Sequence, residues 1–225
     1  MELLNTVFPN LMQKLPEFYQ AIIDTFVMVG ISGSISFILG IIFGVVLIVT
    51  KPGGILERHT IYQVVDKSIN TFRSVPFIIL LTLLLPVTRM VVGTGIGVKG
   101  AIIPLVCGIV PFFSRQVESA LTEIGSGVIE AAQAMGLSPW EVIFKVYLRE
   151  SIAPIVRATT LTTISLIGLT AMAGAVGAGG LGDFAIKYGH NRFQEDVTVG
   201  TVIILVAIVC LIQFLGNKLA AKNTH

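Results

Sequence analysis

The residues of this sequence with the clearest chemical purpose gather in one polar segment between long apolar runs. Within that segment, Glu130-Ala131-Ala132 is followed three residues later by Gly136. We expect a helix that ends at Gly136, because glycine accepts the left-handed conformation that stops a helix. The apolar stripe of this helix is expected to comprise Val128, Ala131, Ala132 and Met135. Such a helix would either dock a soluble partner or only pack beneath membrane helices, and the residues alone leave both interpretations open.

A second helix is expected to begin directly after this stop. Ser138 is suited to the N-cap and Pro139 to the first helical position, and Glu141 completes a capping box with Ser138. Glu141 also stands four residues before Lys145, the favourable order for an ion pair on a helix. An apolar face with three aromatic side chains is expected here, formed by Trp140, Ile143, Phe144 and Tyr147. The two patterns together predict a helical hairpin.

The apolar runs lack the groups that support catalysis or proton transport. All acidic and histidine residues of the sequence lie outside these apolar runs. An intramembrane enzyme would therefore lack a base or metal ligand, and a proton-coupled carrier would lack its carboxylate. A sodium-coupled secondary transporter that uses backbone carbonyls stays open as a remote alternative. No cofactor, metal site or nucleic-acid partner is expected, and Cys107 and Cys210 are interpreted as packing residues inside apolar runs.

Two glycine-rich patterns would indicate nucleotide binding, but neither does so here. Gly177–Gly182 matches G-x-G-x-x-G, yet it ends an apolar run and follows no strand. A flexible or closely packed backbone at a membrane boundary is expected there instead. The P-loop pattern G-x-x-x-x-G-K-[ST] does not occur in the sequence. If ATP drives transport by this chain, the nucleotide is expected to bind another polypeptide.

The composition indicates an integral membrane protein with an all-α, polytopic fold. Hydrophobic residues make up 54% of the 225-residue chain and charged residues 12%, against about 25% charged in soluble proteins. Five membrane-spanning helices are expected, because five apolar stretches reach or come close to the roughly 20 residues that cross a bilayer. They cover residues 25–50, 68–91, 98–115, 152–178 and 197–217. Prolines in the second and third stretches favour positions inside a helix bundle, where neighbours can satisfy the freed carbonyls.

The distribution of lysine and arginine sets the expected orientation. With the N-terminus outside, about twice as many of these residues fall in cytoplasmic as in extracytoplasmic segments. Residues 1–24 are then an extracytoplasmic segment, residues 116–151 a cytoplasmic loop that holds the hairpin, and residues 218–225 a cytoplasmic tail. We therefore expect a multi-pass protein of the cell (inner, cytoplasmic) membrane, with its N-terminus out and its C-terminus in.

The first apolar stretch carries small residues at every fourth position, namely Ser32, Ser36, Gly40 and Gly44. Such a stripe lets another helix approach closely. The partner helix belongs either to the same chain or to a second subunit, and both interpretations stay open at this point.

The hairpin resembles the EAA loop of ABC importer permeases. That loop has the pattern E-A-A, three residues, glycine, nine residues and I-x-L-P. Here Glu130–Ala132 and Gly136 match its first half, while Val146 and Leu148 occupy the isoleucine and leucine positions. The sequence departs from the pattern at Arg149, which replaces the proline. This departure leaves the end of the second helix open.

Two further stretches, Asn70–Leu81 and Ala173–Gly182, join Glu130–Gly136 in resembling the permeases of methionine ABC importers, often called D-methionine permeases. The resemblance runs from about Asp24 to Asn217. It implies a type I ABC importer permease fold with a cytoplasmic coupling hairpin, and a transport subunit rather than an enzyme. It also implies import of methionine as the D- or L-enantiomer. The alternative is a permease for another amino acid or a small dipeptide.

The same resemblance implies partners and residue roles. Two copies of the permease would form the translocation pathway, two ATPase subunits would dock on the coupling loops, and an extracytoplasmic binding protein or lipoprotein would deliver the amino acid. The ATPase contact would fall on Glu130, Ala131, Ala132, Gly136, Ser138, Trp140 and Glu141. Met172 would narrow the pathway, although methionine within a span is most often a packing residue.

Overall fold

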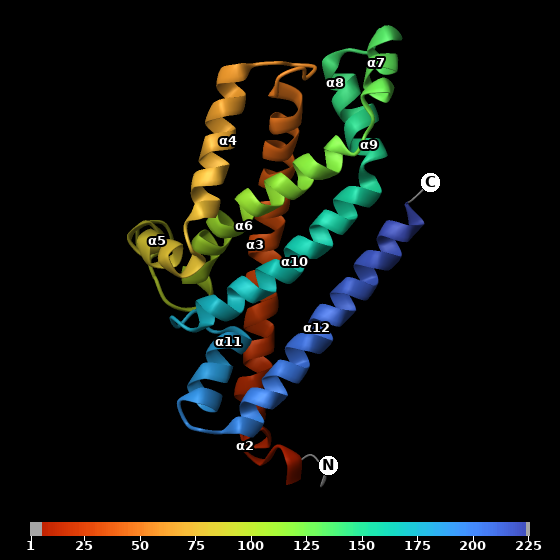
Figure 1. The fold of residues 1–225 in the computed structure, drawn as a ribbon. Coiled ribbons are helices and arrows are strands. Elements are labelled where there is room, and N and C mark those ends of the chain that lie inside the picture. Colours follow the sequence, from red (N-terminus) through yellow and green to blue (C-terminus); the bar gives the residue numbers. More distant parts are fainter. Residues whose placement is uncertain (1–5, 224–225) are drawn as a thin grey trace. The chain divides into compact units, whose positions relative to one another are not determined.

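The computed structural model of the chain describes residues 6–223 and is shown in Figure 1. Helices joined by turns and loops make up this part of the chain, and no strand occurs among residues 6–223, so the all-α prediction is confirmed. The predicted N-terminal segment and C-terminal tail lie partly outside the described residues, because residues 1–5 and 224–225 are not included.

Within residues 6–223, four helices are long and apolar enough to cross a membrane. They are α3 (Leu15–Thr50), α6 (Gly97–Thr122), α10 (Ile152–Gly174) and α12 (Glu195–Lys222). Three of these helices run beyond the predicted spans at one end or both, since helical hydrogen bonding continues into polar residues that hydropathy excludes. The helix α3 thus takes in residues 15–24 of the predicted N-terminal segment, and the short α2 (Pro9–Met12) precedes it.

The predicted span over residues 68–91 is not one straight helix. It falls on α4 (His59–Ser74) and α5 (Phe77–Val92), which meet at a bend of 108°. The break lies at Val75 and Pro76: a proline disfavours the helical conformation of the residue before it, and Val75 is extended. Counting the bent pair as one span gives up to five candidate spans, so the number five stays a prediction.

The chain reverses after α10 instead of continuing as one span to residue 178. The helix α10 ends at Gly174, and α11 (Gly180–Phe184) and the π-helix η2 (Ala185–His190) follow. A Cβ on Gly182 would lie 2.6 Å from the Ala171 Cα, and one on Gly174 would lie 3.0 Å from the Gly182 Cα. Of the two expectations for this glycine-rich motif, a flexible or a closely packed backbone, the structure shows the closely packed one.

Contacts divide the chain into two compact units, each with its own apolar core. The first unit contains the residues up to Ser34, Pro76–Cys107 and Thr163–Ile212. Its core includes the buried side chains of Leu11, Phe18, Ala21, Leu181, Phe184 and Val197. The second unit contains Ile35–Val75, Gly108–Thr162 and the residues from Gln213. Its core includes Ile48, Val49, Phe113, Val117, Leu121, Ile129, Ala132, Val142, Ile143, Tyr147 and Ala158.

The small-residue stripe of α3 packs within the chain. In the second unit Gly40 lies against Phe113 of α6, and a Cβ on Gly44 would lie 3.0 Å from the Ser114 carbonyl oxygen. Ser32 and Ser36, in the first and second units respectively, are buried. The two glycines are thus explained by a close approach of α3 and α6.

Candidate functional site

The hairpin of the second unit contains four helical segments, coloured green in Figure 1. They are α7 (Ser126–Ala134), α8 (Pro139–Glu141), the π-helix η1 (Val142–Tyr147) and α9 (Leu148–Glu150). Gly136 has a φ of 83°, as predicted for the residue that stops α7. The Leu137 N–H donates to the Ala132 carbonyl at 3.2 Å, and the Gly136 N–H to the Gln133 carbonyl at 2.9 Å. These bonds satisfy carbonyls that the end of a helix leaves free.

The capping box predicted at Ser138 and Glu141 is confirmed. The Ser138 Oγ accepts from the Glu141 N–H at 3.4 Å, and the Glu141 carboxylate accepts from the Ser138 N–H at 3.0 Å and from its hydroxyl at 2.9 Å. Lys145 Nζ donates to the same carboxylate at 2.7 Å. The bond from Lys145, together with those from Ser138, lowers the pKa of Glu141 to about 2. Three polar groups therefore fix the start of the second helix.

In the structure, the residues predicted to form the apolar faces of the hairpin are partly buried and partly exposed. On the second helix Ile143 and Tyr147 join the core, whereas Trp140 is 67% exposed and Phe144 is 62% exposed. Phe144 lies within the π-helix η1, whose wider turn changes the angular spacing of side chains relative to an α-helix, whereas Trp140 precedes it in α8. No residue pattern used in the sequence analysis signals this π-helix.

On α7 three of the four members of the predicted apolar stripe are exposed, and one is buried. Ile129 and Ala132 pack into the core, while Val128, Ala131 and Met135 are exposed. Spacing correctly placed these three on one helical side but could not tell whether that side faces the core. We call the exposed residues Val128, Ala131, Met135, Trp140 and Phe144 the apolar face of the hairpin.

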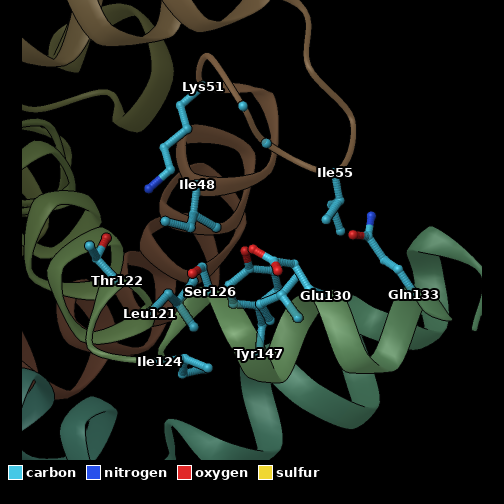
Figure 2. A pocket seen from close by; sticks show the side chains of 13 residues that line it. Ile48, Lys51, Ile55, Leu121, Thr122, Ile124, Ser126, Glu130, Gln133 and Tyr147 are labelled. Atoms are coloured by element: carbon cyan, nitrogen blue, oxygen red, sulfur yellow. The ribbon is translucent and has the colours of Figure 1, made fainter. Parts of the chain in front are cut away.

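A pocket of about 340 Å³ opens beside α7 and is shown in Figure 2. Glu130 and Gln133 reach it from α7, Tyr147 comes from η1, and Lys51 comes from the segment after α3. Its wall combines one carboxylate, one amine, an amide and a phenol with the apolar side chain of Ile48. The first residue of the EAA motif thus lines a polar pocket rather than the apolar face.

Arg149, which replaces the proline of the EAA pattern, is exposed and lies within α9. The helical chain continues through it, and the Ser151 N–H donates to the Tyr147 carbonyl at 3.2 Å. The break comes at Ser151 instead, before α10 begins with Ile152. The missing proline therefore lets the second helix of the hairpin extend to Glu150.

A network of charges in the second unit was missed by the sequence analysis. Arg115 of α6 pairs with Asp66 of α4, donates to the Asn70 amide oxygen at 3.1 Å, and pairs with Glu118 at 2.7 Å. Asp66 and Asn70 lie more than 40 residues before Arg115 in the sequence, so no local pattern predicts these two contacts.

Met172, in the first unit, is 43% exposed along α10. A methionine that only filled a core would be covered by its own chain. The exposure leaves its side chain available to a surface outside this chain or to solvent.

Comparison with known proteins gives concordant matches over most of the chain. Residues 36–221 match the model of the family described as binding-protein-dependent transport system inner membrane component. A probable D-methionine transport system permease protein MetI of Vibrio cholerae is 43% identical over 202 residues, which is 90% of each chain. Its counterpart from Pasteurella multocida is 46% identical over 203 residues, covering 90% of this chain and 94% of the relative.

Solved structures agree with the sequence relatives. A chain of the MetNI methionine ABC transporter, crystallised in inward-facing conformations, is 42% identical and superposes with a TM-score of 0.92. The match covers 95% of this chain and 99% of that one. A chain of an amino acid ABC transporter solved with histidines is only 16% identical, with a TM-score of 0.79, and shares the fold.

Proposed function

Because the chain belongs to the family of binding-protein-dependent transport system inner membrane components, we propose that it is the permease subunit of an ATP-driven methionine importer. The observation that carries the proposal is the match to the MetNI methionine transporter chain, at 42% identity over 95% of this chain. Relatives from two organisms bear names that specify D-methionine, so the D-enantiomer is included among the proposed substrates.

The proposed docking site for the ATPase is the hairpin. Its apolar face presents Trp140, Phe144 and Met135 to solvent, each more than three-fifths exposed. Large aromatic and methionine side chains of this kind are enriched at protein interfaces and are costly to leave in water. The capping box and Gly136 hold the two helices in one fixed relation, so a partner would meet a preformed surface. We propose that two ATPase subunits bind two permease copies in this way.

The remaining roles follow from the same proposal. Met172 narrows the translocation pathway between two permease copies, which is consistent with its exposure on the single chain. An extracytoplasmic binding protein delivers methionine to the opposite side from the hairpin. The N-terminus lies outside and the C-terminus inside, as the lysine and arginine distribution favours.

Uptake measurements test the substrate. Deletion of the gene is expected to abolish high-affinity accumulation of labelled methionine at low external concentration, and the wild-type gene restores it. Competition with D-methionine then reports the enantiomer range. Normal methionine uptake with loss of another amino acid or dipeptide would overturn the substrate while leaving the family intact.

Reporter fusions test the orientation separately. A reporter that works only in the cytoplasm is expected to be active when fused after Ser138 and silent when fused after Gly189. The opposite result would reverse the proposed orientation and move the hairpin away from any cytoplasmic ATPase.

A further inference from the structure

Three cations of the first unit converge on one aromatic ring. The Arg192 guanidinium lies 4.9 Å from the Tyr188 ring centroid, Lys187 Nζ lies 5.2 Å from it, and Lys14 Nζ lies 5.4 Å from it. Cations within about 6 Å of a ring are attracted by its negative face. Attraction to one neutral ring does not cancel the mutual repulsion of three positive charges.

The Tyr188 ring is held in place by packing against other aromatic rings. Phe18 of α3 packs on Phe184 of α11 with centroids 5.2 Å apart, and Phe184 packs on Tyr188 with centroids 5.0 Å apart. Tyr188 also contacts the buried core of the first unit. The position of the cations is therefore set by a packed aromatic row rather than by a free loop.

Among the described residues, no carboxylate lies within ion-pairing distance of this cluster. Lys14, Lys187 and Arg192 form no ion pair within residues 6–223. Asp196, at the start of α12, accepts instead from the backbone and side-chain N–H groups of Asn10, at 2.8 and 2.9 Å. The three positive charges of the cluster therefore have no ion-pair partner among the described residues.

The surroundings of the cluster indicate which anion fits. Lys14 precedes α3 and Arg192 precedes α12, so the cluster lies at the ends of two candidate membrane spans. Next to Arg192, Phe193 has a left-handed φ of 55° and is 90% exposed. Such a φ is strained for an aromatic residue, and it is held by the bond from the Gln194 N–H to the Gly189 carbonyl, at 2.9 Å. Amphipathic segments that lie in the membrane–water interface combine Lys and Arg with Trp, Phe or Leu, which enter the boundary between headgroups and acyl chains.

We propose that Lys14, Lys187 and Arg192 form a binding site for the phosphate of an anionic phospholipid headgroup, with Phe193 inserted beside it in the interface. The phosphate supplies the missing negative charge, and the lipid chains cover the exposed phenyl ring. This site is independent of the transported substrate and of the hairpin.

Native mass spectrometry of the purified permease–ATPase complex, titrated with phosphatidylglycerol, tests the site. The double variant Lys187→Gln/Arg192→Gln is expected to bind this lipid about twenty-five-fold more weakly, at about fivefold per basic side chain. The matched control is Arg89→Gln/Lys99→Gln, which removes two exposed cations of the first unit outside the cluster and is expected to retain binding. Should the double variant fail to assemble, Arg192→Gln alone changes one exposed loop residue and is expected to weaken binding about fivefold.

Two further measurements separate the sources of the anion. Phosphatidylcholine is expected to bind the wild type and the double variant equally weakly, and excess inorganic phosphate is expected not to displace phosphatidylglycerol. Equal losses in both double variants, unchanged lipid binding in Lys187→Gln/Arg192→Gln, or displacement by inorganic phosphate would each overturn the proposal. Unchanged lipid binding with weaker association of the extracytoplasmic binding protein would assign the cluster to protein docking instead.

Discussion

Two of the reversals in the chain direction are built by opposite physical means. Between α7 and α8, polar side chains cap the helices and Gly136 supplies a left-handed turn with no other atom within 4 Å of the position of a Cβ. Between α10 and α11, backbone meets backbone, and a Cβ on Gly182 would lie 2.8 Å from the Ala171 carbonyl carbon. At the first reversal the backbone conformation restricts which residues fit, and at the second the available volume does.

The first reversal is therefore a surface feature, whereas the second belongs to a packed interior. An open turn with satisfied caps can present side chains to a partner, as the exposed Trp140 and Phe144 do. A turn without room for a methyl group can only hold its own helices together. Substitutions at the two reversals should therefore fail in different ways, the first in coupling and the second in folding.

The largest effect is expected at the crowded reversal. Gly182→Ala places a methyl group against the backbone of Ala171, which cannot rotate away as a side chain could. Overpacking costs about 1–3 kcal/mol and occasionally more, and a backbone contact favours the upper end. Thermal unfolding of the purified protein measures the loss. Gly168→Ala in the open part of α10 is the control and is expected to change the midpoint little, because nothing lies within 4 Å of its Cβ position.

Substitutions on the apolar face of the hairpin are expected to weaken ATPase binding rather than to lower the stability of the fold. Trp140→Ala removes a side chain that is 67% exposed, so the unfolding midpoint is expected to stay near the wild-type value. Loss of an aromatic anchor at an interface costs about 2 kcal/mol or more, which co-purification and titration with the ATPase subunit would detect. Ile143→Ala is the contrasting variant, since it empties a buried site and is expected to destabilise the fold by about 2–5 kcal/mol. Unimpaired ATPase binding by Trp140→Ala would mean that this face is not the docking surface.

The open reversal should be sensitive to conformation but not to size. Gly136→Val forces a β-branched residue into a left-handed conformation, at a cost of about 1–2 kcal/mol. Asparagine tolerates that conformation better, so Gly136→Asn is expected to keep more of the ATP-driven transport activity than Gly136→Val. Equal activity of the two variants in liposomes would show that the angle between the helices does not matter for coupling.

The two reversals also differ in how far the sequence revealed them. The stop at Gly136 and the capping box at Ser138 and Glu141 were predicted because their signals are local and chemical. The apolar spans were likewise visible, since hydropathy needs no knowledge of neighbours. The turn after Gly174 was missed as a turn, because its glycines are explained only by a contact with α11.

Other features were hidden for related reasons. Periodicity placed Val128 and Met135 on one side of α7 but not on its exposed side, which only the packing of Ile129 determines. The π-helix η1 has no residue signature in this sequence. The bend before Pro76 had a local signal, but a proline in a membrane helix is compatible with a kink as well as with a break.

The smallest effect concerns the charge that caps the open reversal. The bonds from Lys145 and Ser138 hold the pKa of Glu141 at about 2, below its ordinary value of 4.5. A depressed folded-state pKa means that this contribution to hairpin stability is fully present above about pH 4.5 and is lost as the pH falls through about 2. Glu141→Gln keeps a side chain that can serve in the capping box but carries no charge. The difference in unfolding midpoint between wild type and Glu141→Gln, which cancels the titration of the other carboxyl groups, is therefore expected to shrink between pH 4.5 and pH 2. A difference that stayed constant over that range would mean that the carboxylate of Glu141 contributes no charge-dependent stability, and that glycine and backbone geometry alone hold the hairpin.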